Sequence, residues 1–305
     1  MKLGFVSAIL ADRSFEQVVS FAAENGFASV EIMCWPKGKA ERRYAGVTHI
    51  DVDDLNDKAV KQIQAVLLKH KVVISGLGYY PNPLDPDEEK RKFYAEHIKK
   101  VISACKRLGV SVMNTFIGRD PLKNDNDNFS MFKRIWPDIV SHAESNKVKI
   151  GIENCPMFFS NDEWPGGKNL ARTPAIWRRM FSEIKSDSFG LNYDPSHLLW
   201  QQIDYVRPVY EFKDKIFHVH LKDAKIYCDK LNEVGILAVP LEFHAPKLPG
   251  LGDINWGRFI SALTDIRYAG SACIEVEDRA FEDSPESVRR SLIQSRDFLR
   301  QFVAP

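Results

Sequence analysis

The 305-residue chain has no apolar run close to the roughly 18 residues that a membrane-spanning helix needs. It also has no excess of one charge, because 42 basic residues against 41 acidic residues give a formal net charge of +1. A near-neutral balance provides no general attraction for nucleic acid. We therefore expect neither a nucleic-acid partner nor a membrane partner.

Cysteine is scarce: the five cysteines are odd in number and show no CxxC spacing. This favours a reduced, cytoplasmic protein without disulfides. The chain also lacks a Walker A glycine–lysine loop and a GxGxxG motif, so nucleotide binding has no support. The N-terminus lacks the longer apolar region and the cleavage site of a signal peptide, and we expect it to form the first strand.

Short apolar runs alternate with amphipathic stretches along the whole chain. We read eight strand–helix units in the sequence. This number favours a closed (β/α)8 TIM barrel over an open sheet. Without a linker or a composition shift, we expect one domain over 1–305, with long loops near 155–173 and 224–253 on the mouth side of the barrel. The strands are expected near 2–8, 29–35, 72–78, 111–118, 148–154, 189–194, 216–223 and 271–277.

Helix signals follow most of these strands. Ser14 with Gln17 three residues on predicts a capped helix start. Apolar residues on one face predict a helix over 53–70, and another helix is expected over 129–145.

Four of the predicted strands end in a side chain that can bind a metal ion: Glu153, Asp194, His220 and Glu275. The carboxyl ends of barrel strands meet at one mouth, so these side chains can surround one ion. A single carboxylate at a strand end is usually exposed to solvent or caps a helix. Four such groups in buried strands are harder to explain, because buried charges need partners and these strands carry no equal number of basic residues. Oxygen ligands with one imidazole suit a divalent ion, with manganese as the first candidate and cobalt, zinc, magnesium or iron as the others.

Other side chains are candidate substrate contacts, each with a simpler alternative. His197 is a fifth ligand, a substrate contact or a helix-start residue bonded to the backbone. Lys222 and Asp223 orient substrate hydroxyls or pair with each other. His244 covers the site or is an exposed loop histidine, and Trp164 stacks on a sugar or packs its own loop.

A further group has weaker signals. Glu31 lines the pocket floor or makes a structural hydrogen bond, and His218 is a core histidine in preference to a ligand. The pair Tyr79 and Tyr80 could stack on a sugar, and Arg119 with Lys168 could neutralise an anion.

The segments IEN, NYDPSH, HVHLKD, PGLGDINW and IEVED, in this order, resemble the sugar phosphate isomerase/epimerase family of the xylose isomerase-like TIM-barrel superfamily. That superfamily also holds inosose dehydratases, ketose 3-epimerases and endonuclease IV. The resemblance implies that Glu153, Asp194, His220 and Glu275 bind the metal and that His197 contacts the substrate near it.

The chain departs from the ketose 3-epimerases at two positions. Phe159 and Ile226 stand where those enzymes carry a glutamate and an arginine that hold a free ketose. The stretch over 224–253 is also longer, as in members that act on larger keto-sugars or 3-keto-glycosides. Both departures argue against a simple ketohexose substrate.

The resemblance implies a divalent-metal-dependent isomerase or epimerase acting on a keto-sugar or sugar derivative. Glu153 and Glu275 would act as bases in proton abstraction next to a carbonyl, through a metal-bound enediolate. Two lyase reactions of the same superfamily, inosose-type dehydration and elimination from a 3-keto-glycoside, are the alternative. A non-catalytic sugar-binding barrel and an endonuclease IV-like phosphodiesterase are weaker readings, since the latter needs more histidine ligands. A sugar is the expected small-molecule partner, and the family commonly forms homo-dimers or homo-tetramers.

Overall fold

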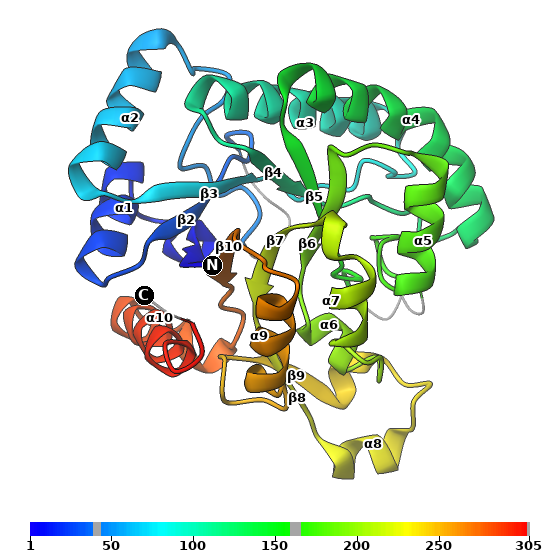
Figure 1. The fold of residues 1–305 in the computed structure, drawn as a ribbon. Coiled ribbons are helices and arrows are strands. Elements are labelled where there is room, and N and C mark those ends of the chain that lie inside the picture. Colours follow the sequence, from blue (N-terminus) through cyan, green and yellow to red (C-terminus); the bar gives the residue numbers. More distant parts are fainter. Residues whose placement is uncertain (39–43, 159–165, 304–305) are drawn as a thin grey trace.

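Eight parallel strands form a closed barrel surrounded by helices in the computed structural model, which describes residues 1–38, 44–158 and 166–303 (Figure 1). The barrel strands are β1 (Lys2–Val6), β2 (Ser29–Met33), β3 (Val73–Gly78), β4 (Val112–Thr115), β5 (Lys149–Glu153), β6 (Phe189–Tyr193), β7 (Ile216–Leu221) and β10 (Ser271–Ile274). Their order around the barrel is β1–β10–β7–β6–β5–β4–β3–β2. The predicted TIM barrel is confirmed, with each strand at its predicted place.

The helices occupy the stretches between the strands. Ser14 and Gln17 form the predicted capping box at the start of the first helix. The second helix begins later than predicted because the side chain of Asn56 accepts a hydrogen bond from Ala59 N and caps it there. The helices are α1 (Phe15–Glu24), α2 (Asp57–His70), α3 (Glu88–Leu108), α4 (Asp125–Asn146), α5 (Pro174–Glu183), α6 (Ser196–Leu199), α7 (Arg207–Glu211), α8 (Cys228–Val234), α9 (Trp256–Asp265) and α10 (Pro285–Leu299).

The main core lies between the strands and the helices. Trp136 of α4 packs against Phe189 with ring centroids 5.7 Å apart, and Trp177 of α5 lies 5.8 Å from Tyr193. All four rings are fully buried, and such aromatic pairs add roughly 0.5–1.5 kcal/mol each beyond burial. Both pairs hold β6, the strand that leads to Asp194.

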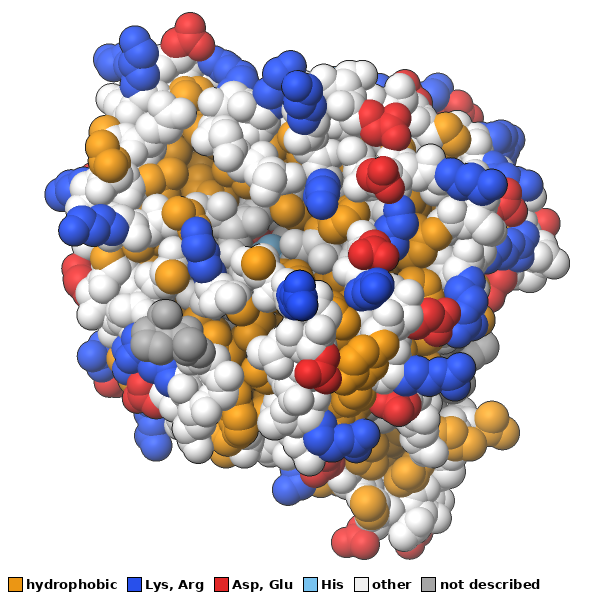
Figure 2. Space-filling model, in the orientation of Figure 1, with side chains coloured by type: hydrophobic (Ala, Val, Ile, Leu, Met, Phe, Trp, Pro, Cys, Tyr) orange, Lys and Arg blue, Asp and Glu red, His pale blue; other side chains and the backbone are white. Residues whose placement is uncertain are grey.

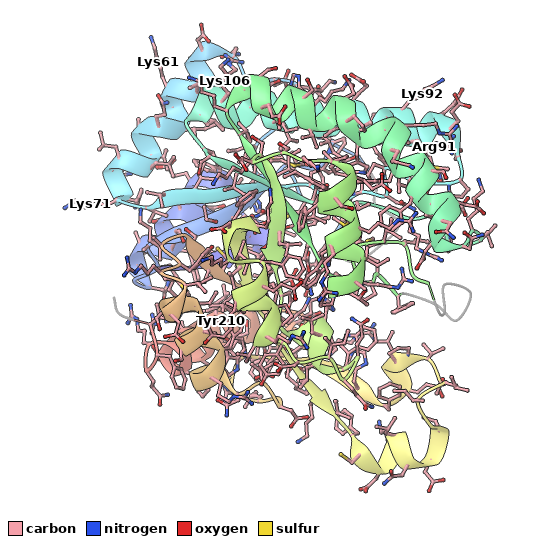
Figure 3. All side chains as sticks on the ribbon, turned by 45° about the vertical axis from the view of Figure 1, so that its right-hand side comes forward. Lys61, Lys71, Arg91, Lys92, Lys106 and Tyr210 are labelled. Atoms are coloured by element: carbon pink, nitrogen blue, oxygen red, sulfur yellow. The ribbon has the colours of Figure 1, made fainter. Side chains whose placement is uncertain are left out.

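The face of the molecule in Figure 2 carries charges of both signs between patches of apolar side chains. Lys61, Lys92 and Lys106 point away from the barrel into solvent (Figure 3). Within the described segments, none of the helices is both long and apolar enough to cross a membrane.

The stretch 224–253 is not the irregular loop that the sequence predicts. It contains an antiparallel hairpin of β8 (Asp223–Ile226) and β9 (His244–Lys247), with α8 between the two strands, and it projects from the barrel (Figure 1). Each strand has only four residues, and no two-residue turn joins them, so the usual hairpin signal is missing. The other predicted loop, 155–173, lies partly outside the described residues.

Asp223 anchors this insertion. Its carboxylate accepts hydrogen bonds from the backbone N–H groups of Gly250 and Ile254 and from the indole of Trp256. The alternative that Asp223 pairs with Lys222 is not what the structure shows, because Lys222 Nζ lies against the carboxylates of Asp194, Glu275 and Glu277. Asp223 holds the PGLGDINW segment instead, because four donors including its neighbour Ala224 converge on its two oxygens.

Candidate metal and substrate site

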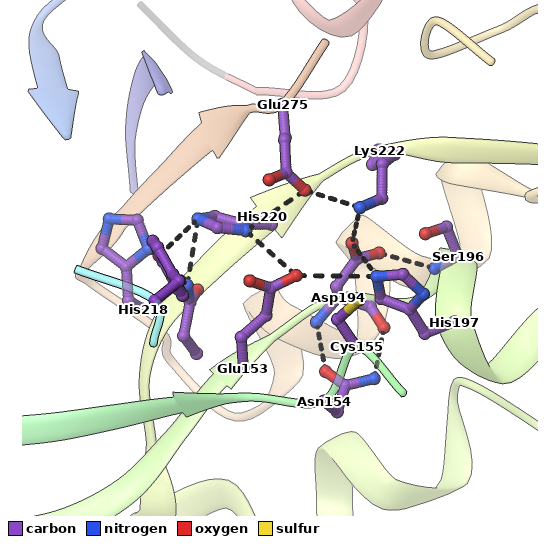
Figure 4. Close-up of polar contacts among 12 residues, drawn as sticks. Glu153, Asn154, Cys155, Asp194, Ser196, His197, His218, His220, Lys222 and Glu275 are labelled. Atoms are coloured by element: carbon purple, nitrogen blue, oxygen red, sulfur yellow. Dashed lines mark hydrogen bonds and ion pairs between the residues drawn. The ribbon is translucent and has the colours of Figure 1, made fainter. Parts of the chain in front are cut away.

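The structure brings the four predicted metal ligands together at the carboxyl end of the barrel (Figure 4). One donor atom from each of Glu153, Asp194, His220 and Glu275 lies within 4.8 Å of all the others. His220 Nδ1 is 3.7 Å from Glu153 Oε1 and 3.5 Å from Glu275 Oε2. Donors about 2.1 Å from a common ion lie roughly 3.0–4.2 Å from one another, so this spacing suits one cation.

Buried polar atoms that make close charged contacts but no hydrogen bond give a second test of fit. Asp194 Oδ2, His197 Nε2 and His220 Nδ1 are buried without a hydrogen-bond partner among the described residues. Leaving such groups unsatisfied costs free energy, which a bound cation relieves for the carboxylate and imidazole lone pairs. Within the described segments, the cluster carboxylates of Asp194 and Glu275 pair with the buried ammonium of Lys222. The residues present therefore fit a divalent ion.

The carboxylate of Glu31 orients the imidazole of His220, on the side of the ring opposite to the cluster. Its Nε2 lies 2.8 Å from Glu31 Oε2, and Glu31 is fully buried. A carboxylate at this place keeps the proton on Nε2 and leaves the Nδ1 lone pair for a metal. The hydroxyl of Tyr80 donates to the other oxygen of Glu31. A Cβ at position 78 would lie 2.2 Å from Met33 Cε and 2.6 Å from Glu31 Oε1, so any residue larger than Gly78 would displace these side chains.

Asparagine side chains hold two of the proposed ligands, Glu153 at the end of β5 and Asp194 directly after β6. Asn154 donates to Asp194 O and accepts from Asp194 N, both at 2.8 Å. The backbone N–H of Ser196 donates to Asp194 Oδ1 at 2.7 Å, which leaves Oδ2 facing the cluster. Asn169 donates to the backbone carbonyl of Glu153 at 2.9 Å. These contacts fix the position of Asp194 and the backbone of Glu153 within the cluster.

Lys222 follows β7 and pairs with three carboxylates. Its Nζ lies 2.6 Å from Glu275 Oε2, 2.9 Å from Glu277 Oε2 and 3.2 Å from Asp194 Oδ2. Burial opposes the charged form, but these carboxylates raise the pKa of Lys222 well above its usual value. Lys222 lines the cavity next to the cluster, so it both positions Glu275 and faces the substrate space.

The two glutamates have different electrostatic surroundings. Burial, and then the charge of Glu275, raise the pKa of Glu153 to about 7. Burial also works against ionised Glu275, but Lys222 and His220 outweigh it and hold the pKa of Glu275 below its usual value.

His197 and His244 both reach the cavity. His197 lies in α6, and its Nε2 is 3.5 Å from Glu153 Oε1 and 3.4 Å from Asp194 Oδ2. Burial, and then the charge of Lys222, lower the pKa of His197 well below its usual value, so its imidazole is neutral. His244 is buried and stacks on Trp200, which excludes the exposed-loop reading. Trp164 lies outside the described residues.

The remaining candidates have structural contacts. Glu31 makes the hydrogen bonds described above and does not line the cavity. His218 lies 3.0 Å from Asn192 Oδ1 and 3.1 Å from Ser75 Oγ through its two ring nitrogens, as expected of a core histidine. Arg119 is buried and donates to the carbonyls of Gly167 and Lys123.

A cavity of about 670 Å³ opens above the cluster. Much of its wall consists of apolar side chains that the sequence did not single out. In sequence these residues read as ordinary core positions, so no signal separates them from buried packing. They include Val6, Met33, Phe116, Met157 and Trp200, with Cys155 beside Glu153.

The chain has matches among known proteins. A family model described as a xylose isomerase-like TIM barrel matches residues 19–302. The chain is 27% identical over 341 residues to the uncharacterized protein YfiH of Bacillus subtilis (strain 168), with 100% of both chains covered.

Solved structures share the fold at low sequence identity. A D-psicose 3-epimerase crystallised with D-fructose matches with a TM-score of 0.73 and 13% identity over 100% of both chains. The IolI protein with a bound zinc atom matches with a TM-score of 0.72 and 16% identity over 100% of both chains. The probable 3-DHS dehydratase AsbF from Bacillus anthracis matches with a TM-score of 0.68 and 14% identity, over 96% of this chain and 97% of its own.

Proposed function

Since the chain belongs to the xylose isomerase-like TIM-barrel family, we propose that it is a divalent-metal-dependent enzyme that isomerises or epimerises a keto-sugar or sugar derivative. The convergence of Glu153, Asp194, His220 and Glu275 carries this proposal. A divalent ion held there, manganese in the first instance, acts as a Lewis acid toward negative charge that develops on a substrate oxygen. The bound zinc of the IolI structure supports an ion in this fold.

Glu153 and Glu275 supply the proton transfers. They come from different sides of the cluster, on β5 and after β10, and both line the cavity. One carboxylate removes the proton from the carbon next to the substrate carbonyl, and the other returns a proton. Return to the same carbon from the opposite face gives an epimer, and transfer to the neighbouring carbon gives an isomer.

Two further side chains bind the substrate. Neutral His197 offers its imidazole to a substrate hydroxyl beside Glu153. Lys222 holds Glu275 in place and presents its positive charge to a substrate oxygen. His244, stacked on Trp200, closes the cavity from the side of the hairpin.

A lyase is the second candidate. The same proton abstraction can be followed by loss of a group from the next carbon instead of reprotonation. The likeness to a probable dehydratase and a cavity larger than one monosaccharide favour this outcome.

Incubation of the manganese-loaded protein with a panel of keto-sugars in D₂O tests the proposal. Carbon-bound deuterium without loss of atoms supports an isomerase or epimerase, and loss of water or an aglycone supports the lyase. Chelated protein and Glu153→Gln serve as matched controls and should show no exchange. Equal exchange in the loaded protein and both controls, or none with any keto-sugar, contradicts the proposed function.

A further inference from the structure

A cysteine lies beside the cluster and has no part in the function proposed above. Cys155 follows Glu153 by two residues, lines the cavity and stays partly exposed. Figure 4 shows its sulfur next to the contact between Glu153 and His197. One donor atom from each of these three residues lies within 4.8 Å of the other two. They form a further group of possible ligands, which shares Glu153 with the first.

The imidazole of His197 gives this group an unused donor atom. Its Nε2 is buried without a hydrogen-bond partner among the described residues. It lies 3.5 Å from Glu153 Oε1 and 3.4 Å from Asp194 Oδ2. Two ligands about 2.1 Å from one tetrahedral ion are roughly 3.4 Å apart, so these distances suit a shared cation. With its proton on Nδ1, the neutral ring presents a lone pair at Nε2.

The backbone holds the cysteine and the glutamate in place together. The side-chain amide of Asn169 donates to the carbonyl of Glu153 at 2.9 Å and to the carbonyl of Cys155 at 2.7 Å. In extended chain, residues two apart point to the same side, which here is the cavity. Donors held in this way need little rearrangement to bind an ion.

The nearby charges can compensate a second divalent ion. Within the described segments, the ammonium of Lys222 interacts with four carboxylates, those of Glu275, Glu277, Asp194 and Glu153. A first divalent ion and Lys222 together carry one charge fewer than these carboxylates. A thiolate at Cys155 raises the deficit to two, which a second divalent ion balances.

The two groups differ in the metal that their donors favour. Three carboxylates and one imidazole suit manganese, whereas the added sulfur selects a softer ion such as zinc. Burial, and then the charge of Glu153, raise the pKa of the Cys155 thiol, so the sulfur is protonated without a second ion. Zinc displaces this proton on binding, because the metal binds the thiolate.

We propose that Cys155, His197 and Glu153 bind a second, thiophilic divalent ion, with Glu153 bridging it to the ion of the first group. All three side chains line the cavity, so a further coordination position stays open to water. Manganese, which prefers oxygen donors, fills the first group only. In the function proposed above, His197 binds a substrate hydroxyl, so the second ion and the substrate compete for it.

Titration with Co²⁺ tests this inference without any turnover. Cobalt replaces zinc as the probe because its thiolate complexes absorb in the near ultraviolet through charge transfer from sulfur. Chelator-stripped protein, kept reduced, is dialysed against Co²⁺ or Mn²⁺, and the bound metal per chain is measured. The wild type should bind two equivalents of Co²⁺ and show thiolate absorption. It should bind one equivalent of Mn²⁺.

Cysteine variants locate the second ion. Cys155→Ala should bind one equivalent of Co²⁺ and lose the thiolate absorption. Cys155→Ser keeps the size of the side chain, should give the same result, and keeps the test valid should the alanine variant fail to fold. Cys228→Ala removes an exposed cysteine of α8 and is the matched control, which should keep both equivalents and the absorption.

Fewer than two equivalents of Co²⁺ in the wild type would overturn the inference. A single equivalent with thiolate absorption would mean that one ion takes both groups of ligands. Thiolate absorption that both Cys155 variants retain, or two equivalents of Mn²⁺, would overturn it as well. The D₂O experiment is independent of this one: absence of exchange with every keto-sugar contradicts the enzymatic proposal and leaves the cobalt stoichiometry unaffected.

Discussion

The contact between Glu31 and His220 gives the sharpest prediction about the metal centre. Glu31 is fully buried on β2, makes no direct approach to the ion position, and reaches His220 Nε2 at 2.8 Å. Glu31→Gln keeps the size of the side chain and removes its charge. One amide oxygen must then serve both donors, Tyr80 and His220, and the imidazole loses the charged acceptor that fixes its tautomer and strengthens Nδ1 as a ligand.

The expected cost follows from this single contact. A hydrogen bond to a charged group contributes about 1.5–3 kcal/mol, and outer hydrogen bonds to ligating histidines typically alter metal affinity by about 10–100-fold. A 10–100-fold rise in the Kd for Mn²⁺ corresponds to about 1.4–2.7 kcal/mol, so the two ranges agree. We expect a rise of this size in the Glu31→Gln variant.

Calorimetric titration of Mn²⁺ into chelator-stripped protein measures the change. Asp120→Asn is the control, because it also neutralises a buried carboxylate but lies after β4, away from the cluster. Its Kd should stay within about twofold of the wild-type value, a difference smaller than 0.5 kcal/mol. A folded Glu31→Gln protein that binds Mn²⁺ as tightly as the wild type would refute the reasoning.

Three other outcomes are expected. Glu153→Gln and Glu275→Gln should each lower turnover of a keto-sugar by at least about 10²-fold, as for a general acid–base group; near-normal rates would make them structural. Asp223→Ala strands buried N–H donors of the 250–256 segment and should lower the free energy of unfolding in urea by at least about 2 kcal/mol; an unchanged midpoint would contradict its anchoring role. Burial lowers the pKa of His97 in the folded protein, whereas the unfolded residue titrates at about 6.5. The unfolded state therefore binds a proton first as the pH drops below that value, and the free energy of unfolding falls. His97→Gln should show a smaller drop in Tm between pH 7.5 and 5.5, and an identical drop would exclude this contribution.

The barrel was predictable because the same sequence pattern recurs at each of its strands. Each strand is a short apolar run, and each is followed by helix-cap or loop residues, as Ser14 and Gln17 illustrate. The convergence of the four proposed ligands was predictable for a related reason. Glu153, Asp194, His220 and Glu275 each interrupt or end an apolar strand with a group that is costly to bury alone.

Three features required the structure. The role of Asp223 depends on donors that lie 27 to 33 residues further along the chain. The pairing of Lys222 with Glu275 depends on the adjacency of β7 and β10, which the sequence separates by the hairpin. The apolar side chains of the cavity wall cannot be recognised in sequence, since Met33 and Phe116 look the same whether they face a core or a cavity. Cytoplasmic location and homo-dimer or homo-tetramer assembly stay predictions.

Anomalous X-ray diffraction from crystals grown with Mn²⁺ tests the central claim most directly. The account predicts one manganese peak at the barrel mouth, within about 2.0–2.3 Å of donor atoms of Glu153, Asp194, His220 and Glu275. A manganese peak elsewhere, or no peak at a saturating Mn²⁺ concentration, would contradict it.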